Sequence, residues 1–273
     1  MENSNKFLFF KGVPLLSSVH DVEHIQRMQD EFEFQDEDVI VMTYPKSGTH
    51  WMIHILSLIY SKGDPTWVKS VPYWERCPWI EIKTNMENVK NKANSHLFTS
   101  HLPAHLFPKS YFTSKAKILY VCQESKGRPC SLYHFKIISH LTLLYGSWFD
   151  HIKGWLPMRN SEKFLFLTYE EIHQNLKVSV EKICQFMGKE LIEEEINSVM
   201  KNASFQVMKK YILENKEPMP IKNMESAKIM MMRKGICGDW KNHFTVTQKE
   251  TFNEQYQEKM KGMEQDLFPW DQC

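Results

Sequence analysis

Residues 39–51 read VIVMTYPKSGTHW, and this stretch decides the fold. Its first five residues are apolar or β-branched and predict a buried strand, which the Tyr-Pro pair that follows should end. An apolar helix over residues 51–60 comes next, and Ser47 and Thr49 are suitable N-cap residues for it. The stretch therefore predicts an α/β fold in which a tight turn joins a buried strand to the N-terminus of a helix.

Such a turn is suited to bind an anion. Its backbone N–H groups and the positive end of the helix dipole point at one position, Lys46 adds a full charge there, and Gly48 lets the backbone come close. We expect a bound phosphate or sulfate, and a capped helix beside a solvated lysine is the alternative. The full Gly-x-x-x-x-Gly-Lys-Ser/Thr spacing is absent, which argues against a Mg-dependent nucleoside triphosphatase.

A second stretch far downstream strengthens the anion-site hypothesis. Residues 233–245 read RKGICGDWKNHFT, with two adjacent cations, two glycines and a tryptophan in an expected loop before a helix. Together with Tyr-Pro-Lys-Ser-Gly-Thr at residues 44–49, this stretch closely resembles the two signature motifs of the cytosolic sulfotransferases. The resemblance covers about residues 7–270 and is nearest to the hydroxysteroid and bile-salt branch.

The resemblance implies a fold, an activity and a set of site residues. The fold is a single three-layer α/β/α domain over residues 1–273, with a mainly parallel sheet and a P-loop-like phosphosulfate-binding turn. The activity is transfer of a sulfuryl group from 3′-phosphoadenosine 5′-phosphosulfate to a hydroxyl of a steroid, bile acid or similar lipid alcohol, without a metal. Trp74 and Trp79, in an aromatic-rich segment, are candidates for the acceptor site. The implied donor-binding residues are Lys46, Ser47, Gly48, Thr49, His50, Trp51, Ser131, Tyr169, Ser204, Phe205, Met232, Arg233, Lys234 and Gly235.

His101 is the candidate general base. Residues 97–103 predict a short strand ending at a proline, which places His101 near the C-terminal rim of a parallel sheet, where such sheets keep their ligands. A structural histidine is the alternative, but this residue matches the family's base, and an imidazole with a pKa near neutral can accept the hydroxyl proton. Lys46 is implied to neutralise the leaving phosphate. His105 lies four residues further on, but Pro103 intervenes and no other ligands are evident, so we expect no metal site.

His50 stands where the family usually has a neutral polar residue. An ionisable imidazole within reach of the sulfuryl position could share or replace the base role of His101, or add positive charge when protonated. The alternative is a neutral histidine that hydrogen-bonds the donor.

Two departures from the family pattern bear on activity. The family's arginine and serine that hold the 3′-phosphate are matched here by Gln123 and Ser131. An amide in place of a guanidinium removes a charge-assisted contact worth roughly 1.5–3 kcal/mol. Residues 136–144 are also considerably shorter than the matching helix and loop of the family. The alternative function is therefore a catalytically weak or inactive relative that binds nucleotide or steroid without turnover, and a kinase-like phosphoryl transferase is a more distant one.

Composition limits the partners and the compartment. The net charge is +1, so no overall field attracts nucleic acid or an acidic membrane surface. No signal-like N-terminus and no membrane-length apolar run is visible, which predicts a cytoplasmic protein. The cysteines have no paired or metal-like spacing and should be free thiols. They are Cys77, Cys122, Cys130, Cys184, Cys237 and Cys273.

The remaining elements follow from periodicity. Residues 202–205 read as a loop, and the methionine-rich residues 209–230 fit either a lid over the acceptor or a solvated loop. Residues 241–250, KNHFTVTQKE, match the family's dimerisation motif and predict a weak homodimer, although an ordinary helix start capped by Thr245 is the alternative. The expected helices are 21–34, 148–158, 178–187, 191–199 and one from 246, and the further strands are 117–122 and 163–168.

Overall fold

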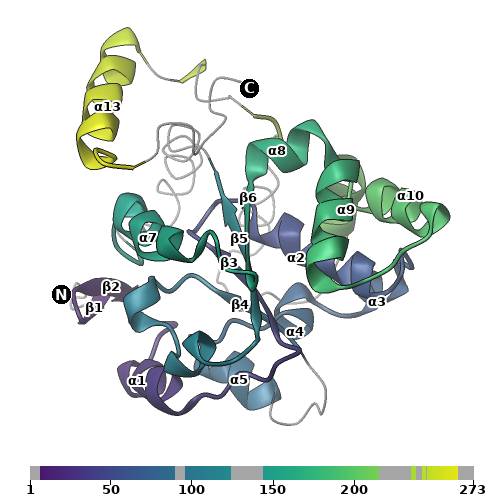
Figure 1. Ribbon diagram of the computed structural model, residues 1–273, viewed down its shortest axis with the longest axis horizontal. Helices are drawn as coiled ribbons and strands as arrows, with labels where there is room; N and C mark the ends of the chain where they lie inside the picture. Colours follow the sequence, from purple (N-terminus) through teal and green to yellow (C-terminus); the bar gives the residue numbers. More distant parts are fainter. Residues whose placement is uncertain are drawn as a thin grey trace.

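The centre of the protein is a sheet of four parallel strands. The structure is a computed structural model that describes residues 7–89, 96–123, 144–214, 235–237, 242–243 and 245–263. The strand order is β4-β3-β5-β6 (Figure 1). This arrangement confirms the predicted α/β fold with a mainly parallel sheet. The strands are β3 (Val39–Thr43), β4 (Leu97–Ser100), β5 (Lys117–Cys122) and β6 (Phe164–Thr168).

The register brings the carboxyl ends of these strands to one edge. Val39 pairs with Leu97 of β4 and with Lys117 of β5. Strand β5 also pairs in parallel with β6. The segments that follow the four strands therefore leave the sheet on the same side. Ligands of open parallel sheets bind at this edge, so the fold concentrates the predicted site residues there.

Alternation along β3 divides the core into two hydrophobic clusters. Val39 and Val41 pack in one cluster, whereas Ile40 and Met42 pack in the other. Because successive strand residues point to opposite faces, both faces of the sheet must be covered. The first cluster is covered by α2 (Thr49–Tyr60), α3 (Thr66–Ser70), α9 (Leu176–Met187) and α10 (Glu193–Asn202); the second by α1 (Val22–Glu31), α7 (Trp148–Trp155) and β2 (Val13–Leu16). In Figure 1 these two groups lie on opposite sides of the strands.

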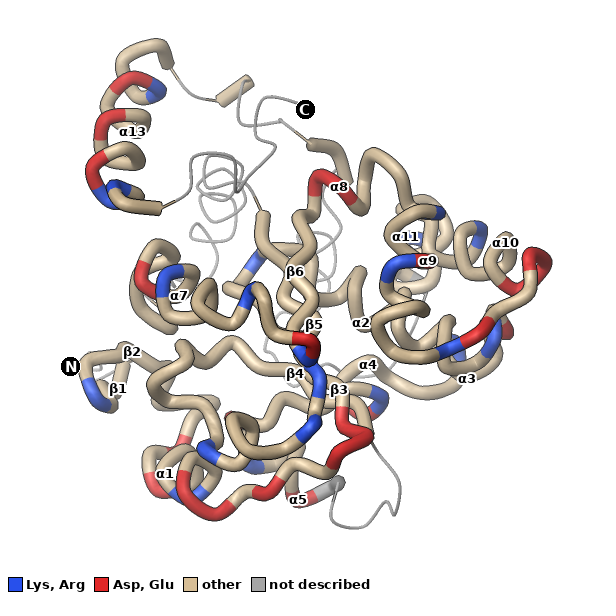
Figure 2. The backbone as a smooth tube through the Cα atoms, viewed as in Figure 1, with Lys and Arg blue, Asp and Glu red and all other residues tan. Residues whose placement is uncertain are grey.

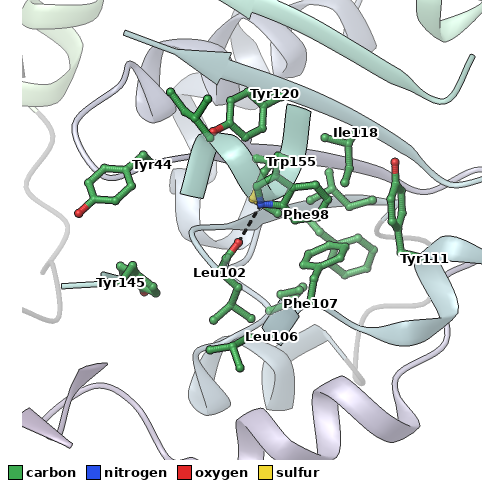
Figure 3. Packing of buried hydrophobic residues seen from close by; sticks show 14 of the residues in the cluster. Tyr44, Phe98, Leu102, Leu106, Phe107, Tyr111, Ile118, Tyr120, Tyr145 and Trp155 are labelled. Carbon is green, nitrogen blue, oxygen red and sulfur yellow. Dashed lines mark hydrogen bonds between the residues drawn. The ribbon is translucent and has the colours of Figure 1, made fainter. Parts of the chain in front are cut away.

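The cluster under α7 is rich in aromatic rings. Trp155 is fully buried, and its indole N–H donates to Leu102 O at 3.1 Å (Figure 3). Phe107 and Tyr111 lie beside it, with ring centroids 5.1 and 6.2 Å from that of Trp155. Such burial of several large rings stabilises this side of the sheet and holds the segment after β4 in place.

The predicted helices and strands are confirmed, with ends that differ by a few residues. Where the sequence predicts a helix at 148–158, the structure has α7 and a 3-10 turn, η3 (Leu156–Met158). The final helix, α13 (Val246–Lys259), begins at Val246 as expected, with Thr245 as its cap, as in the alternative interpretation of residues 241–250. The other elements are α4 (Tyr73–Arg76), α5 (Lys83–Val89), η1 (Ala104–Leu106), η2 (Lys109–Phe112), α8 (Tyr169–Gln174) and α11 (Phe205–Glu214).

The predicted N-cap of α2 is wrong. Gly48, with φ of 95°, is the cap residue, and no side chain caps the helix. Neither Ser47 nor Thr49 takes that role, because Thr49 is already helical and its Oγ1 lies 2.7 Å from Thr43 Oγ1. The first N–H groups of α2 thus have no side-chain cap.

The loop prediction for residues 202–205 and 209–230 needs correction. Asn202 is the last residue of α10 and Phe205 the first of α11, so only Ala203 and Ser204 connect the two helices. Helix α11 continues to Glu214, and the rest of the predicted lid lies outside the described residues.

Charges of both signs are mixed over the outer helices. Figure 2 shows acidic and basic residues together on α1, α10 and α13. Within the described ranges, no helix has the length and apolarity needed to cross a bilayer. Cys77 and Cys184 are buried free thiols, as the cysteine spacing predicts.

Candidate active site

The turn after β3 is held by Tyr44. Its hydroxyl donates to Gly146 O at 2.6 Å and lies 3.1 Å from Leu144 O, which ties the turn to the segment before α7. Lys46 has a φ of 69°, a left-handed conformation that is uncommon for a residue with a side chain. Such conformations persist where the surrounding structure enforces them, and they cluster at binding sites.

Ser47 and Gly48 make the turn fit an anion. Ser47 is fully buried, and its Oγ has no hydrogen-bond partner among the described residues. A Cβ on Gly48 would lie 2.9 Å from Tyr169 Cδ2, so only glycine fits against that ring. An unsatisfied buried hydroxyl beside an uncapped helix N-terminus is what a bound phosphate or sulfate would satisfy.

Trp51 and Tyr169 form an aromatic platform beside this turn. Their ring centroids are 5.3 Å apart, and the Trp51 indole N–H donates to Ala203 O at 2.8 Å. Ala203 leads through Ser204 into Phe205, and a Cβ on Gly235 would clash with the Phe205 ring. The platform therefore brings together predicted donor residues from α2, α8, α11 and the downstream motif.

His173 of α8 contacts Gly235, which belongs to the second signature stretch, residues 233–245. Its Nε2 lies 2.9 Å from Gly235 O, so this nitrogen donates to the carbonyl. Ser204, between α10 and α11, donates to Lys201 O at 2.9 Å. Four predicted donor residues fall outside the described residues: Ser131, Met232, Arg233 and Lys234.

His101 follows β4 directly and reaches across to the end of β3. Its Nδ1 lies 2.9 Å from Thr43 O and 3.1 Å from Thr43 Oγ1. A carbonyl oxygen can only accept, so Nδ1 carries the hydrogen and, in the neutral ring, Nε2 is the nitrogen able to take a proton.

The pKa of His101 departs from the sequence-based expectation of a near-neutral value. Burial lowers it to about 4, the hydrogen bond to Thr43 acts in the opposite direction, and the nearby His20 lowers it further. The imidazole is therefore neutral at physiological pH, which is the protonation state that a general base needs.

Aromatic rings surround His101 and His50. Trp79 lies 6.0 Å from His101 and 6.0 Å from His50 between ring centroids, and Tyr73 packs edge-on to His50 at 4.6 Å. Trp74 contacts Tyr73 at 4.8 Å rather than either histidine. Trp79 thus packs against both imidazole rings, whereas Trp74 packs against Tyr73.

His50 is neutral at physiological pH. Burial lowers its pKa to about 3, and the positive charge of Lys46 and the proximity of His101 add to the effect. A protonated His50 as a source of positive charge is therefore disfavoured by its surroundings.

Three residues that sequence reasoning did not single out lie against His101. The backbone N–H of His101 donates to Glu81 Oε1 at 2.8 Å, and the Tyr145 ring lies 5.3 Å away in an edge-on geometry. His20 contacts the Tyr145 hydroxyl at 2.7 Å. One feature of the sequence could have indicated Glu81: it is the single acidic residue in the otherwise apolar run Trp-Ile-Glu-Ile. An acidic residue in such a run is expected to be buried, and a buried charge needs a specific reason.

Gln123 lies at the same edge of the sheet. It follows the last residue of β5, whose neighbours are β3 and β6. Its side chain is a neutral amide, so this position adds no positive charge to the site. In the described part of the chain no three His, Cys, Asp or Glu side chains are grouped to hold a metal ion.

These features define an α/β protein with an anion-binding turn at the carboxyl edge of a parallel sheet and a neutral histidine beside it. Comparison with known families gives a match to the sulfotransferase domain over residues 36–264. The chain belongs to the sulfotransferase family.

Curated relatives match the chain over nearly its full length. It is 45% identical to sulfotransferase 2A1 of Macaca fascicularis, covering 98% of this chain and 100% of the relative. It is 44% identical to the 3-beta-hydroxysteroid sulfotransferase of Cavia porcellus, covering 99% and 100%. The first alignment runs over 285 positions although this chain has 273 residues, so the relative contains residues that this chain lacks.

Solved structures share the fold. Mouse sulfotransferase SULT7A1 complexed with PAP superposes with a TM-score of 0.77 at 24% identity, covering 94% of this chain and 96% of that one. Retinol dehydratase in complex with androsterone and inactive cofactor PAP gives 0.75 at 18% identity, covering 95% and 90%.

Proposed function

We propose that this chain transfers a sulfuryl group from 3′-phosphoadenosine 5′-phosphosulfate to the hydroxyl of a steroid, bile acid or similar lipid alcohol. The observation that carries the proposal is His101 beside the anion-binding turn, with Nδ1 held by Thr43 O and Nε2 able to accept a proton. The near full-length hydroxysteroid sulfotransferase relatives support the choice of acceptor.

The described residues would act as follows. Lys46 and the N-terminus of α2 stabilise negative charge at the turn, and Ser47 Oγ supplies a hydrogen bond that it does not make within the described protein. Trp51 and Tyr169 provide a surface for a purine ring. His101 takes the proton of the acceptor hydroxyl at Nε2. The donor, when bound, supplies the activated sulfuryl group.

The acceptor would lie against the aromatic wall around Trp79. This ring contacts both His101 and His50, so an apolar ring system packed there would present a hydroxyl to His101. Trp74 would support the wall through Tyr73. Apolar burial of the acceptor, with one hydroxyl at the base, matches the requirements of a lipid alcohol.

Titration with 3′-phosphoadenosine 5′-phosphate, followed by thermal unfolding and then by turnover of hydroxysteroids, tests the proposal. We expect stabilisation of about 2.7 kcal/mol at a hundredfold excess over Kd, and turnover that His101→Ala abolishes without loss of nucleotide stabilisation. Absence of any thermal shift at millimolar nucleotide would exclude a working donor site.

A catalytically weak or inactive relative is the second candidate, and Gln123 is the observation that favours it. The end of β5 carries this neutral amide where the resembling family has an arginine. Restoring the guanidinium by Gln123→Arg should tighten nucleotide binding by about one to two decades, because a charge-assisted contact is worth roughly 1.5–3 kcal/mol. The matched control, Gln123→Met, should weaken binding only slightly. Equal affinities of the two variants would show that the position does not face the nucleotide.

The role of His50 can be separated from that of His101. Since burial lowers the pKa of His50 to about 3, we propose that it acts as a neutral hydrogen-bonding residue. His50→Asn should then retain turnover within a few-fold, whereas His101→Ala should not. A loss in His50→Asn as large as in His101→Ala would assign the base role to both.

We also propose the remaining assignments, which rest mainly on the sequence. The donor contacts of Ser131, Ser204, Phe205, Met232, Arg233, Lys234 and Gly235, a single domain over residues 1–273, a cytoplasmic location and a weak homodimer through residues 241–250 are proposals of this kind. For the homodimer, the described start of α13 leaves Val246 73% exposed, which makes it accessible to a second copy.

A further inference from the structure

Glu81 is a fully buried carboxyl group in contact with the candidate base. Its relative exposure is 0%, and its Oε1 accepts the backbone N–H of His101 at 2.8 Å. Its Oε2 is buried and has no hydrogen-bond partner among the described residues. An ionised carboxylate with one unpartnered oxygen in such a place is costly, so the group needs a specific explanation.

The hydrogen-bond chain behind Glu81 indicates where the hydrogens lie. His20 Nδ1 is 3.0 Å from Leu16 O, so Nδ1 donates to that carbonyl and, in the neutral ring, Nε2 is an acceptor. The Tyr145 hydroxyl is 2.7 Å from this Nε2, and its single hydrogen therefore goes to His20.

With the Tyr145 hydrogen on His20, the longer contact between Tyr145 and Glu81 favours a hydrogen on Glu81. The Tyr145 hydroxyl oxygen is 3.3 Å from Glu81 Oε1, and its own hydrogen is already used in the shorter contact to His20. A carboxylate would face a lone pair, whereas a carboxylic acid can donate. The opposite assignment, an imidazolium at His20 with a carboxylate at Glu81, would bury two charges.

Burial raises the pKa of Glu81 to about 7, although its contacts with the backbone N–H of His101, with Ser100 and with Tyr145 lower it, and burial lowers the pKa of His20 to about 4. Both burial effects disfavour an imidazolium at His20 paired with a carboxylate at Glu81. The other titratable groups near Glu81 are His101, Tyr145 and His24, whose Nε2 lies 2.9 Å from Ile80 O.

Resting on the proposed function, we propose that Glu81 is a positioning residue that holds the base His101 in place as a neutral carboxylic acid. It fixes the backbone of His101 through the N–H contact, and it fixes the ring through Tyr145, which packs edge-on against the imidazole at 5.3 Å. Rigid supporting contacts of this kind matter because a displacement of about 1 Å can cost about a hundredfold in rate.

Glu81→Gln and Glu81→Leu test the proposal with closely matched volumes. Glutamine keeps an acceptor oxygen for the His101 N–H and is uncharged, as the acid is, whereas leucine has no hydrogen-bonding group. We expect kcat of Glu81→Gln within about threefold of wild type, and a fall of about ten- to a hundredfold in Glu81→Leu with KM for the acceptor little changed. Both should keep stabilisation by 3′-phosphoadenosine 5′-phosphate, which reports folding and the donor site.

Two outcomes would overturn the proposal. An equal loss of kcat in Glu81→Gln and Glu81→Leu would mean that the ionised carboxylate is required, and no loss in Glu81→Leu would mean that Glu81 does not position the base. Tyr145→Phe, which keeps the ring but removes the hydroxyl between Glu81 and His20, should give an intermediate loss.

A measurement without turnover separates this proposal from the proposed function. Nitrogen-15 NMR of histidine-labelled protein should show His101 with hydrogen on Nδ1 in the wild type and in Glu81→Gln, and a mixture of tautomers in Glu81→Leu. An unchanged His101 tautomer and titration in Glu81→Leu would contradict positioning even if no acceptor is ever turned over. Turnover failure with the expected tautomer pattern would contradict only the proposed function.

Discussion

Thr43 joins the two halves of the candidate site. Its Oγ1 lies 2.7 Å from Thr49 Oγ1 in the helix that follows the turn, and 3.1 Å from Nδ1 of His101. Its carbonyl accepts from the same Nδ1 at 2.9 Å. One buried residue at the end of β3 therefore connects the anion-binding turn to the candidate base.

Replacing this hydroxyl should impair both parts. In Thr43→Val the Thr49 hydroxyl loses its partner, which should destabilise the protein by roughly 1–3 kcal/mol, because a buried polar group is left unsatisfied. We also expect lower kcat, measured with saturating donor, since His101 loses one of two contacts. Thr99→Val is the control: Thr99 is equally buried and donates to Cys77 O at 2.9 Å, so it should affect stability but not kcat. Equal kcat values of the two variants would contradict the assigned role of Thr43.

Gly48 is required by its backbone and by its neighbour. Gly48→Ala would strain a residue with φ of 95° and place a Cβ 2.9 Å from Tyr169, so we expect a loss of stability of roughly 1–3 kcal/mol and much weaker nucleotide binding. Gly12→Ala separates the two causes, because Gly12 has φ of 82° but open space around its Cα. Thermal unfolding with and without nucleotide should show strain in both variants and loss of ligand stabilisation only in Gly48→Ala. Unimpaired ligand stabilisation in Gly48→Ala would remove the anion site from this turn.

The position of a single residue in the fold could be predicted only where a local sequence pattern defines it. The phosphate-type turn and His101 follow from strand ends that the sequence marks clearly. Glu81, Tyr145 and His20 were missed, because they are far apart in the chain and only the tertiary fold brings them together. The prediction of Ser47 as an N-cap of α2 was wrong, because the left-handed conformation of Gly48 cannot be read from N-cap preferences.

Elements with strong periodicity were predicted, whereas short or turn-controlled ones were not. Helix α9 and strand β5 follow from long apolar patterns. The hairpin of β1 (Phe7–Phe10) and β2 was not predicted. In the structure Lys11 and Gly12, which connect the two strands, have φ of 47° and 82°, and a two-residue hairpin turn of this kind needs a positive φ at both residues. Helices α3 and α4 are too short to show a period, and each follows a proline, at 65 and 72.

Helix α8 positions the platform residue Tyr169 through its capping box. Thr168 Oγ1 accepts the N–H of Glu171 at 3.1 Å, and Glu171 Oε2 accepts the N–H of Thr168 at 2.8 Å. Thr168→Ala should reduce stability by about 1 kcal/mol, and it should weaken nucleotide binding about two- to fivefold, because the first turn that carries Tyr169 would fray.

The control for this prediction is a second helix with the same type of cap. Thr245 and Gln248 form the capping box of α13, which carries none of the described platform residues. Thr245→Ala should leave nucleotide affinity unchanged in isothermal titration. If both variants weaken binding equally, or neither does, α8 does not position the donor platform.

At the scale of the whole molecule, buried neutral histidines set the response to acid. Burial lowers the pKa of His20, His54 and His101 to about 4, that of His50 to about 3, and it also lowers that of His24. Below their ordinary value of 6.5 the unfolded chain binds protons that the folded protein does not. The free energy of unfolding should therefore fall as the pH decreases from about 6.5 towards 4, by up to about 1.4 kcal/mol per pH unit for each histidine.

Glu81 acts with the opposite sign in the same range. Its pKa of about 7 exceeds the ordinary value of 4.5, so between these values the folded protein holds a proton that the unfolded chain releases, and this favours folding as the pH falls. The stabilisation that acid gives through Glu81 alone is smaller than the destabilisation that it gives through the five histidines, so the free energy of unfolding still falls as the pH decreases.

Urea unfolding at pH 7.5, 6.5 and 5.5 would measure this balance. His54→Gln keeps a donor for Asn202 O, which His54 Nε2 contacts at 3.1 Å, and should flatten the pH dependence by close to one proton. Glu81→Gln should steepen it, because the opposing proton is lost. A pH-independent free energy of unfolding, or a slope in His54→Gln equal to that of the wild type, would mean that His54 titrates alike in the folded and unfolded chain.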